Sequence, residues 1–501
     1  MKLSRLFKAL ERQVTRSAEA GPGDADVRGL SYDSRQVQKG DVFIALKGLK
    51  ASGSDFAADA VARGAVAVVS DSASSASGAS AGVPWVVVDD ARRAMAALAA
   101  EFYEHPSRAM QVVGITGTNG KTTTAYLLRA LFEAAGTKSG LLGTVSYMVG
   151  DEQMSSSRTT PEAPDVQRML RLMVDRGCAA CVMEVSSHAL ALKRVDETRF
   201  AAGVFTNLTR DHLDYHKDME SYFAAKRRLF EMLPDGAAGV INLDDPRGDS
   251  LVRAASRPVT YAVTRAADVT PGPLSLTWDG LEFDARTPRG RVHVRSRLVG
   301  RPNVSNILAA VSTAIALDLP IPAIEAGLAE LDGVPGRFQM VSGPRDNIAV
   351  VVDYAHTDDA LKNLLETARP LAQSRVITVF GCGGDRDRTK RPLMGAVAAR
   401  LSDVVIVTSD NPRSEDPARI IEEIKLGIQS ADRAAGSFFA IVDRADAIEQ
   451  AIKMAEPGDL VLLAGKGHEK TQVIGGQELP FDEVEIARAA LDRRRAVSRV
   501  H

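Results

Sequence analysis

The chain has 501 residues, which is too long for a single hydrophobic core, so two to four domains are expected. Its 45% hydrophobic and 25% charged residues are typical of a water-soluble globular protein, and its formal net charge of −2 argues against nucleic acid or an anionic membrane surface as the main partner. No apolar stretch reaches membrane-spanning length, and the first residues lack the apolar core of a signal peptide, so we expect a cytoplasmic protein that does not insert into a membrane.

The first 107 residues are expected to form a small α/β domain. The elements predicted there are strands at 41–46, 65–69 and 85–88 and helical segments at 56–62 and 91–103. His105-Pro106-Ser107 then has the composition of a hinge before the next strand.

Residues 108–337 are predicted to form a central domain with a parallel sheet of the kind found in phosphate-loop ATPases. Apolar runs at 180–184, 202–206 and 239–243 alternate with helical segments, a pattern typical of parallel strands with helical crossovers. Cys178 and Cys181 have no second pair with which to complete a zinc site, so we expect them to pack around the first of these strands. The stretch 259–299 alternates polar and apolar residues and is predicted to be a small antiparallel sheet.

A third α/β unit, with a Rossmann-like pattern, is expected over residues 338–501. Its predicted strands, separated by amphipathic helices, are 348–352, 376–380, 404–407 and 460–464. The glycine turn at 381–384 follows a strand but lacks the Lys-Ser/Thr that a second phosphate loop requires.

The most informative stretch is GITGTNGKTT at residues 114–123, between an apolar run and a helical segment. Glycines on a strand-to-helix turn free backbone N–H groups to bind phosphate. Lys121 adds a charge for the terminal phosphates, and the Thr122 hydroxyl is a ligand for Mg²⁺. The predicted nucleotide-binding residues of this loop are Gly117, Thr118, Asn119, Gly120, Lys121, Thr122 and Thr123.

Polar residues follow the next two strands of the predicted parallel sheet. Glu184 ends the first of them, on the edge of the sheet where ligands bind, and is our candidate for the Mg²⁺ ligand opposite Thr122. The second strand leads into a run at 206–216 that contains His212 among several phosphate- and metal-binding residue types. Lys226 lies ten residues further on, in what is by itself a basic helix face.

Together these segments resemble the Mur ligases, the ATP-dependent amide-forming enzymes of peptidoglycan synthesis. The resemblance rests on GTNGKT at 117–122, EVSSH at 184–188, NLTRDHLD at 207–214, NVSN at 303–306, GRF at 336–338 and DYAH at 353–356. It implies a three-domain α/β enzyme in which ATP phosphorylates a substrate carboxylate and an amine then displaces the phosphate. Mg²⁺, Lys121 and His212 would neutralise charge on the transferring group.

The resemblance also implies a role for three further residues. Lys226 would be carbamylated, which converts a cation into an anion and adds it to the metal ligands Thr122, Glu184 and His212. Asn303 and Arg337 would contact the nucleotide. A helix cap is the alternative for Asn303, because a helix is predicted to open at Ser305.

The third unit indicates which amine is added. Asp410-Asn411-Pro412-Arg413, Arg386 in GDRD at 384–387, and Gly465 and Glu469 in GKGHE at 465–469 resemble the members of the family that add meso-diaminopimelate. The planar fork of Arg413 suits the extra carboxylate that distinguishes this amine from lysine. A surface arginine is the alternative. A lysine-adding ligase, a folylpolyglutamate synthetase and a nucleotide switch are the other functions to separate from this one, although no Asn-Lys-x-Asp guanine-reading motif is present.

The second substrate implied by the resemblance is UDP-N-acetylmuramoyl-L-alanyl-D-glutamate. Its UDP end would be held by Tyr32, Ser34, Leu49, Lys50 and Ala51, and its peptide part by Thr159, Thr160, Ser186 and Arg194. Arg158 and Leu192 depart from the family pattern, since some members carry amides there. The partners expected are thus small molecules, and the chain is expected to act as a monomer.

Overall fold

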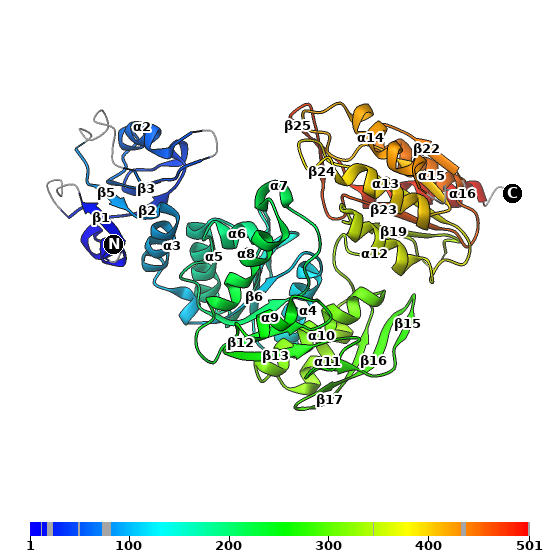
Figure 1. The fold of residues 1–501 in the computed structure, drawn as a ribbon, viewed down its shortest axis with the longest axis horizontal. Helices are drawn as coiled ribbons and strands as arrows, with labels where there is room; N and C mark the ends of the chain where they lie inside the picture. The colour runs from blue at the N-terminus through cyan, green and yellow to red at the C-terminus, as the bar shows by residue number, and fades with distance from the viewer. Residues whose placement is uncertain are drawn as a thin grey trace.

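The computed structural model describes residues 1–11, 13–17, 24–48, 51–72, 82–343, 345–431 and 437–498. Figure 1 shows an elongated molecule, with an N-terminal sheet at one end, a C-terminal sheet at the other and the central segment between them. Each sheet lies wholly within one of the predicted segments 1–107, 108–337 and 338–501. The structure is therefore α/β as predicted, while the domain boundaries themselves stay a prediction. In the described residues no helix is long and apolar enough to span a membrane.

The N-terminal segment contains a five-stranded sheet in the order β1-β5-β4-β3-β2. β1 is antiparallel to β5, and the other pairs are parallel. The three predicted strands and two predicted helices are all present; β1 and β2 were not predicted. The elements are α1 (Leu3–Phe7), η1 (Lys8–Leu10), β1 (Val14–Ser17), β2 (Gly29–Ser31), η2 (Ser34–Gln36), β3 (Asp41–Ala45), η3 (Gly53–Phe56), α2 (Ala57–Ala62), β4 (Ala67–Ser70), β5 (Trp85–Val88), α3 (Ala91–Phe102) and η4 (Pro106–Arg108).

The central sheet has eight strands in the order β13-β12-β11-β6-β10-β7-β8-β9. It is parallel from β13 to β7, and β8 and β9 add an antiparallel edge. The strands are β6 (Gln111–Thr116), β7 (Ser139–Leu142), β8 (Ser146–Val149), β9 (Glu152–Ser155), β10 (Ala180–Glu184), β11 (Phe200–Phe205), β12 (Ala238–Asn242) and β13 (Arg257–Tyr261). The helices are α4 (Lys121–Ala134), α5 (Ala163–Asp175), α6 (Ser187–Ala191), α7 (Leu213–His216), α8 (Met219–Glu231), α9 (Gly248–Val252), α10 (Arg301–Ala316) and α11 (Ile321–Glu330).

Helices cover both faces of the central sheet, which explains why its strands are continuous apolar runs. Residues of α4, α10 and α11 pack against one face, and residues of α5 and α8 pack against the other. Cys181 is fully buried within β10 and Cys178 is buried just before it, so their predicted packing role is confirmed. Burial raises the pKa of the Cys181 thiol.

The prediction of antiparallel strands over 259–299 was wrong for its first strand. β13 contains Val259 and pairs in parallel with β12. It is the edge strand of that sheet and is partly exposed, so it lacks the continuous apolar run that marks the buried parallel strands. The rest of the stretch is antiparallel, as predicted: β14 (Thr270–Pro271), β15 (Ser275–Thr277), β16 (Gly280–Thr287) and β17 (Gly290–Ser296).

The C-terminal segment has a six-stranded sheet in the order β18-β19-β23-β20-β21-β22, parallel except for β18, and a separate hairpin of β24 and β25. All four predicted strands are present. The strands are β18 (Gln339–Met340), β19 (Ala349–Asp353), β20 (Val376–Phe380), β21 (Val404–Val407), β22 (Ser437–Ala440), β23 (Leu460–Ala464), β24 (Thr471–Ile474) and β25 (Gln477–Pro480). The helices are α12 (Asp358–Ala368), α13 (Lys390–Leu401), α14 (Pro417–Gln429), α15 (Arg444–Met454) and α16 (Glu483–Ser498).

Candidate active site

The predicted phosphate loop connects β6 to α4, which begins at Lys121. Gly120 caps the helix with a φ of 88°, and a Cβ there would lie 2.3 Å from Asn306 Oδ1. A Cβ on Gly117 would lie only 1.8 Å from Thr206 Oγ1. Both positions therefore require glycine, for backbone conformation and for space. The loop brings the backbone of the turn close to the strand ends of the parallel sheet, where anionic ligands bind.

Thr122 and Glu184, two of the four predicted metal ligands, are in direct contact. The Thr122 hydroxyl donates to Glu184 Oε2 over 3.0 Å, and Glu184 is 1% exposed at the end of β10. Glu184 also accepts hydrogen bonds from the Thr144 backbone N–H at 2.8 Å and the Thr144 hydroxyl at 3.0 Å. A carboxylate beside a hydroxyl fits Mg²⁺, which favours oxygen ligands and keeps several waters or phosphate oxygens. The described residues contain no cluster of three or more His, Cys, Asp or Glu side chains able to hold a metal by themselves.

Two lysines, half-buried Lys121 and fully buried Lys226, converge on the same backbone carbonyl. Lys121 Nζ donates to Gly117 O at 2.9 Å and to Thr118 O at 2.8 Å, and Lys226 Nζ donates to Gly117 O at 2.8 Å. Lys226 is 1% exposed and lies 4.3 Å from the centre of the Tyr222 ring, so the basic helix face suggested by its sequence neighbours is wrong for this residue. Burial, reinforced by the nearby charge of Lys121, lowers the pKa of Lys226 well below its ordinary value. The neutral amine is thereby favoured.

His212 lies at the start of α7 with a left-handed φ of 54°. Its Nε2 is 3.3 Å from Asp211 Oδ2, and its ring packs edge-on against His188. Desolvation by the surrounding protein lowers the pKa of His212, although Asp211 opposes the shift. The neutral imidazole that results can offer a nitrogen lone pair to a metal ion. Its predicted roles as metal ligand and charge neutraliser stay predictions.

Arg337 and Asn303, the two nucleotide contacts implied by the resemblance, both lie near the phosphate loop. Arg337 Nη2 donates to the Thr122 hydroxyl at 3.2 Å, and its guanidinium lies 4.6 Å from the centre of the Tyr354 ring. The helix-cap alternative for Asn303 was wrong, since α10 begins at Arg301 after the N-cap Gly300. The Asn303 side-chain amide donates instead to Val299 O at 2.8 Å.

A cavity of about 300 Å³ brings most of these groups together, although Gly117 and Lys226 do not line it. It is lined by twelve of the predicted site residues: Thr118, Asn119, Gly120, Lys121, Thr122, Thr123, Thr159, Glu184, Ser186, His212, Asn303 and Arg337. Lining residues absent from the predicted set include Thr144, Asn306, Phe338, Tyr354, His356 and Asn363. The NVSN, GRF and DYAH motifs contained a signal for four of these, Asn306, Phe338, Tyr354 and His356, whereas nothing in the sequence marked Thr144 or Asn363.

The residues predicted to hold the peptide part of the substrate lie together beside Glu184. The Thr160 hydroxyl donates to Glu184 O at 2.8 Å and accepts from the Ser186 backbone N–H at 3.1 Å. Arg194 Nη1 donates to Thr160 O at 3.1 Å. Thr159 joins the group through a 3.0 Å hydroxyl contact with Thr144. Arg158, which departs from the family pattern, forms an ion pair with Glu162 at 2.6 Å.

Of the residues predicted to hold the UDP end, the three that the structure describes, Tyr32, Ser34 and Ala51, do not line the cavity. The Tyr32 hydroxyl donates to Asp165 Oδ2 at 2.8 Å, and this bond links the N-terminal segment to α5. Ser34 begins η2, and Ala51 is exposed. Leu49 and Lys50 lie outside the described residues. Binding of UDP by this group stays a prediction.

Four of the residues predicted to bind the amine lie around Lys466, which was not among the predicted residues. Lys466 is fully buried, and its Nζ donates to Asn411 Oδ1 and to Glu469 Oε2, both at 3.0 Å. It also lies 3.7 Å from Asp410 Oδ1, and Asn411 Nδ2 donates to Glu469 Oε2 at 2.9 Å. Gly465 precedes Lys466 with a φ of 121°. The lysine therefore holds side chains of two different loops together, those of Asn411 and Glu469.

Arg413 is half-buried in the loop after β21, and its role as a ligand of the amine's carboxylate stays a prediction. Its Nη1 donates to Gly384 O at 2.7 Å, and its backbone bonds to both sides of β24, with N donating to Val473 O at 2.9 Å and O accepting from Gly475 N at 2.7 Å. Pro412 is buried beside it, whereas Arg386 is exposed. None of the predicted amine-binding residues lines the 300 Å³ cavity.

Fold and site together define a nucleotide-binding α/β enzyme whose phosphate loop is accompanied by two further groups of ligand-type residues. Three family models match the chain: the Mur ligase family catalytic domain at residues 26–103, the Mur ligase middle domain at 115–314 and the Mur ligase glutamate ligase domain at 336–467. The chain belongs to the Mur ligase family.

Relatives of the chain match it over nearly its full length. The UDP-N-acetylmuramoyl-L-alanyl-D-glutamate–2,6-diaminopimelate ligase of Geobacter metallireducens is 48% identical, over 96% of this chain and 97% of that one. The protein of the same name from Gloeobacter violaceus is also 48% identical, over 94% of this chain and 95% of that one. A solved structure bearing this name is 34% identical with a TM-score of 0.66, covering 94% of this chain and 95% of that one.

More distant structures show the fold alone. MurF from Acinetobacter baumannii is 19% identical with a TM-score of 0.66, over 92% of this chain and 94% of that one. Folylpolyglutamate synthase from Mycobacterium tuberculosis, solved with ADP and AMPPCP, is 17% identical with a TM-score of 0.58, over 79% of this chain and 93% of that one. Because the fold extends to such different ligases, it cannot by itself identify the amine.

Proposed function

We propose that the chain joins meso-diaminopimelate to UDP-N-acetylmuramoyl-L-alanyl-D-glutamate at the expense of ATP, in peptidoglycan biosynthesis. The observation that carries the proposal is a phosphate-loop cavity accompanied by a separate loop, in which Arg413 is bonded to Gly384 O and Asn411 to Glu469. The names of the full-length relatives support the same substrates. The enzyme would work in the cytoplasm as a monomer, with domains at 1–107, 108–337 and 338–501.

The nucleotide would occupy the cavity, with its phosphates on the loop and its base toward Asn303. Lys121 and Arg337, which bond to residues of the loop, would meet the phosphate charge. Thr122 and Glu184 would hold Mg²⁺, which when bound supplies Lewis-acid stabilisation of the phosphoryl oxygens. The loop backbone, Lys121 and Arg337 then position the terminal phosphoryl group, which is most of what phosphoryl transfer demands.

Lys226 would be carbamylated. In that reaction its nitrogen lone pair forms a bond to the carbon of CO₂, a proton leaves the nitrogen, and the product carries one negative charge. Only a neutral amine can do this, and burial lowers the pKa of Lys226 in the required direction. A carbamate there would also compensate the cluster of positive charge around Gly117 and serve as an oxygen ligand for a second Mg²⁺.

Amide formation would proceed in two displacements. An oxygen of the D-glutamate γ-carboxylate attacks the terminal phosphorus of ATP, and ADP leaves. The nitrogen lone pair of the deprotonated diaminopimelate amine then attacks the acyl carbon, a proton leaves the nitrogen, and the bond to phosphate breaks. Thr160, Ser186 and Arg194 would orient the peptide for the first step. Because the amine-site loops do not line the cavity, the C-terminal segment would close for the second step and exclude water.

Arg413 would select the amine. Diaminopimelate has a carboxylate that lysine lacks, and a guanidinium already fixed on Gly384 O can bind it with little loss of conformational entropy. An arginine left without that carboxylate disfavours lysine, since specificity arises from groups that remain unpaired in the wrong complex.

Phosphate release by the purified chain tests the proposal. We expect release only when ATP, the UDP-linked dipeptide and meso-diaminopimelate are all present, with lysine a poor amine. Turnover with lysine but not diaminopimelate would make the chain a lysine-adding ligase. Glutamate addition to a folate would favour the folylpolyglutamate synthetase alternative, and ATP hydrolysis independent of dipeptide and amine would favour a nucleotide switch.

A further inference from the structure

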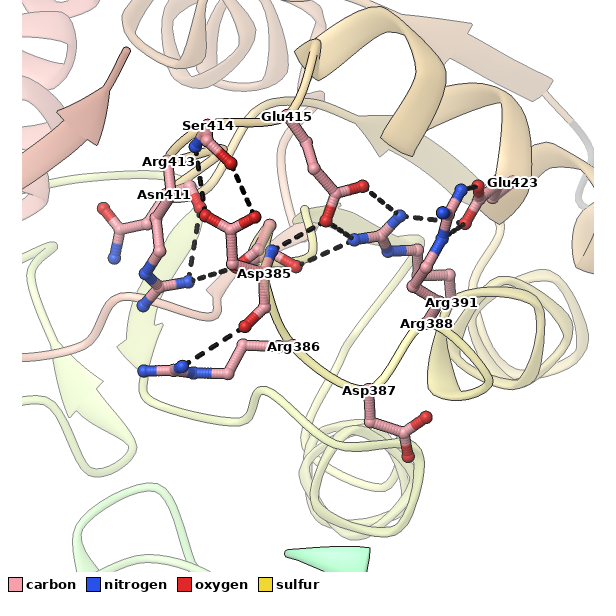
Figure 2. A network of polar contacts seen from close by, with 12 residues as sticks. Asp385, Arg386, Asp387, Arg388, Arg391, Asn411, Arg413, Ser414, Glu415 and Glu423 are labelled. Atoms are coloured by element: carbon pink, nitrogen blue, oxygen red, sulfur yellow. Dashed lines mark hydrogen bonds and ion pairs between the residues drawn. The ribbon is translucent and has the colours of Figure 1, made fainter. Parts of the chain in front are cut away.

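Two loops of the C-terminal segment are hydrogen-bonded to each other at Arg413. The first follows β20 and contains Gly384 and Asp385; the second follows β21 and contains Arg413 (Figure 2). Gly384 N donates to Asn411 O at 2.9 Å and Gly384 O accepts from Arg413 Nη1 at 2.7 Å. A Cβ on Gly384 would lie 1.9 Å from Pro412 O, so the two backbones touch. Any shift of the first loop therefore moves the guanidinium of Arg413.

Arg391, the second residue of α13, lies behind this junction with none of its side chain exposed. Its Nη2 and Nη1 donate to the two carboxylate oxygens of Glu415 at 2.8 and 3.0 Å. Nη1 also donates to Glu423 Oε2 at 2.9 Å, and Nη2 donates to Gly383 O at 3.2 Å. One guanidinium thus binds the first loop, the second loop and α14 at the same time.

Glu415 connects Arg391 by hydrogen bonds to the residues next to Arg413. Its Oε1 accepts from the Asp385 backbone N–H at 2.7 Å. The Asp385 carboxylate in turn accepts from the Ser414 hydroxyl at 2.7 Å and the Ser414 backbone N–H at 3.2 Å. Hydrogen bonds from Arg391 lower the pKa of Glu415 to about 2, so the carboxylate stays ionised at any working pH.

The framework behind Arg391 leaves it little freedom to move. α13 and α14 pack backbone to backbone: a Cβ on Gly395 would lie 2.2 Å from Ile424 O, and one on Gly427 would lie 1.8 Å from Pro392 O. Arg388, at the end of the first loop, also pairs with Glu423, but its side chain is 62% exposed and, in the described structure, donates hydrogen bonds to Glu423 alone. It therefore serves as the matched control.

We propose that Arg391 is a positioning residue for amine specificity: through Glu415, Asp385 and the Gly383 carbonyl it fixes the loop that orients Arg413. Arg391 itself does not touch the substrate. The inference rests on the proposed function only in naming the amine, because the geometry that it explains is that of Arg413.

A double-mutant cycle in the full-length enzyme tests this role. For Arg391→Met we expect the KM for diaminopimelate to rise about tenfold, which corresponds to about 1.4 kcal/mol, with the KM for ATP within about twofold of wild type. In an Arg413→Ala background the same substitution should add nothing, because it acts through a guanidinium that is already gone. Arg391→Lys should recover part of the loss, since an ammonium can still reach the carboxylates, and Arg388→Ala should match wild type.

Lysine as the amine gives a second readout. It lacks the carboxylate that Arg413 would bind, so Arg391→Met should lower kcat/KM for diaminopimelate more than for lysine. A purely structural role would lower both alike, raise the KM for ATP as well, and add its full effect to Arg413→Ala; any of these results overturns the inference. Where Arg391→Met fails to fold, Glu415→Gln keeps an acceptor for Asp385 N–H and is expected to give the same selective loss.

Different measurements test the proposed function and the positioning role of Arg391. A wild-type enzyme that does not use diaminopimelate refutes the proposed function. The cycle between Arg391 and Arg413 is then measured with the amine that the enzyme does use, and its coupling still decides the role of Arg391.

Discussion

Arg413 combines binding chemistry with a strained backbone, and the two can be separated by substitution. Its φ of 53° lies in the left-handed region, where a residue with a Cβ is disfavoured by about 1–2 kcal/mol. Alanine at this position keeps the strain, whereas glycine removes it but loses about 0.5–1 kcal/mol more backbone entropy on folding. Arg413→Gly should therefore be more stable than Arg413→Ala by about 0.5–1 kcal/mol.

The same pair of variants measures what the guanidinium contributes to binding. Both lose the bond to Gly384 O and the predicted bond to the amine's carboxylate. A hydrogen bond to a charged group contributes about 1.5–3 kcal/mol, so each variant should raise the KM for diaminopimelate about 10- to 150-fold. The KM for ATP should stay near the wild-type value, because Arg413 does not line the nucleotide cavity.

Urea unfolding and steady-state kinetics on the two variants provide the comparison. The strain argument is refuted if the alanine variant is as stable as the glycine variant, because the left-handed backbone then has no energetic cost. The binding argument is refuted if the KM values for ATP and diaminopimelate rise together, which would make Arg413 a structural residue of the loop.

Four other substitutions or titrations probe the rest of the molecule. Glu184→Gln keeps an acceptor for the Thr144 N–H but loses the negative charge that would bind Mg²⁺. In a metal titration at fixed ATP, half-maximal activity should therefore need about tenfold more Mg²⁺, a loss of about 1.4 kcal/mol in metal binding. Lys226→Met should abolish the carbamate signal seen by NMR with ¹³CO₂ and lower kcat by about 10² or more; a wild-type enzyme without that signal would contradict the modification. Arg444→Met leaves fully buried Glu483 unpaired and should lower the free energy of unfolding by about 3–5 kcal/mol in urea, whereas replacing both partners with apolar residues should recover most of it. The pKa of Glu415 is lowered, so its contribution to stability is complete above about pH 4.5 and is lost as the pH falls through about 2; Glu415→Gln should flatten that acid limb of a urea series.

The sequence predicted the buried strands well because a parallel sheet covered on both faces needs continuous apolar runs. The predicted strands at 180–184, 376–380, 404–407 and 460–464 have the bounds of β10, β20, β21 and β23. The antiparallel edge of β8 and β9 was missed, since the residues of β9 are largely polar and exposed. Pro302 in the first turn of α10 was an available signal for a helix start before Ser305.

The nucleotide site could be predicted because its residues lie in contiguous motifs on a strand-turn-helix. Lys466 and Arg391 could not, because a buried lysine or arginine has the same local sequence as a solvated one. Lys466 is flanked by glycines, and Arg391 lies in the first turn of α13, three residues after exposed Arg388. Only the fold reveals that Asp410 lies near Lys466 and that Glu415 and Glu423 pair with Arg391.

These buried cations change what determines the choice of amine. Arg413 would provide the contact with the carboxylate, but its position depends on the Gly384 carbonyl, on the two bonds of its backbone to β24, and on the ionised network centred on Arg391. Grafting residues 410–413 onto a relative that adds another amine would therefore transfer the guanidinium but not the contacts that hold it in position. An error of about 1 Å in a reacting group can cost about 10²-fold in rate. A functional transfer of amine specificity should need Arg391 and Glu415 together with the loop that they hold.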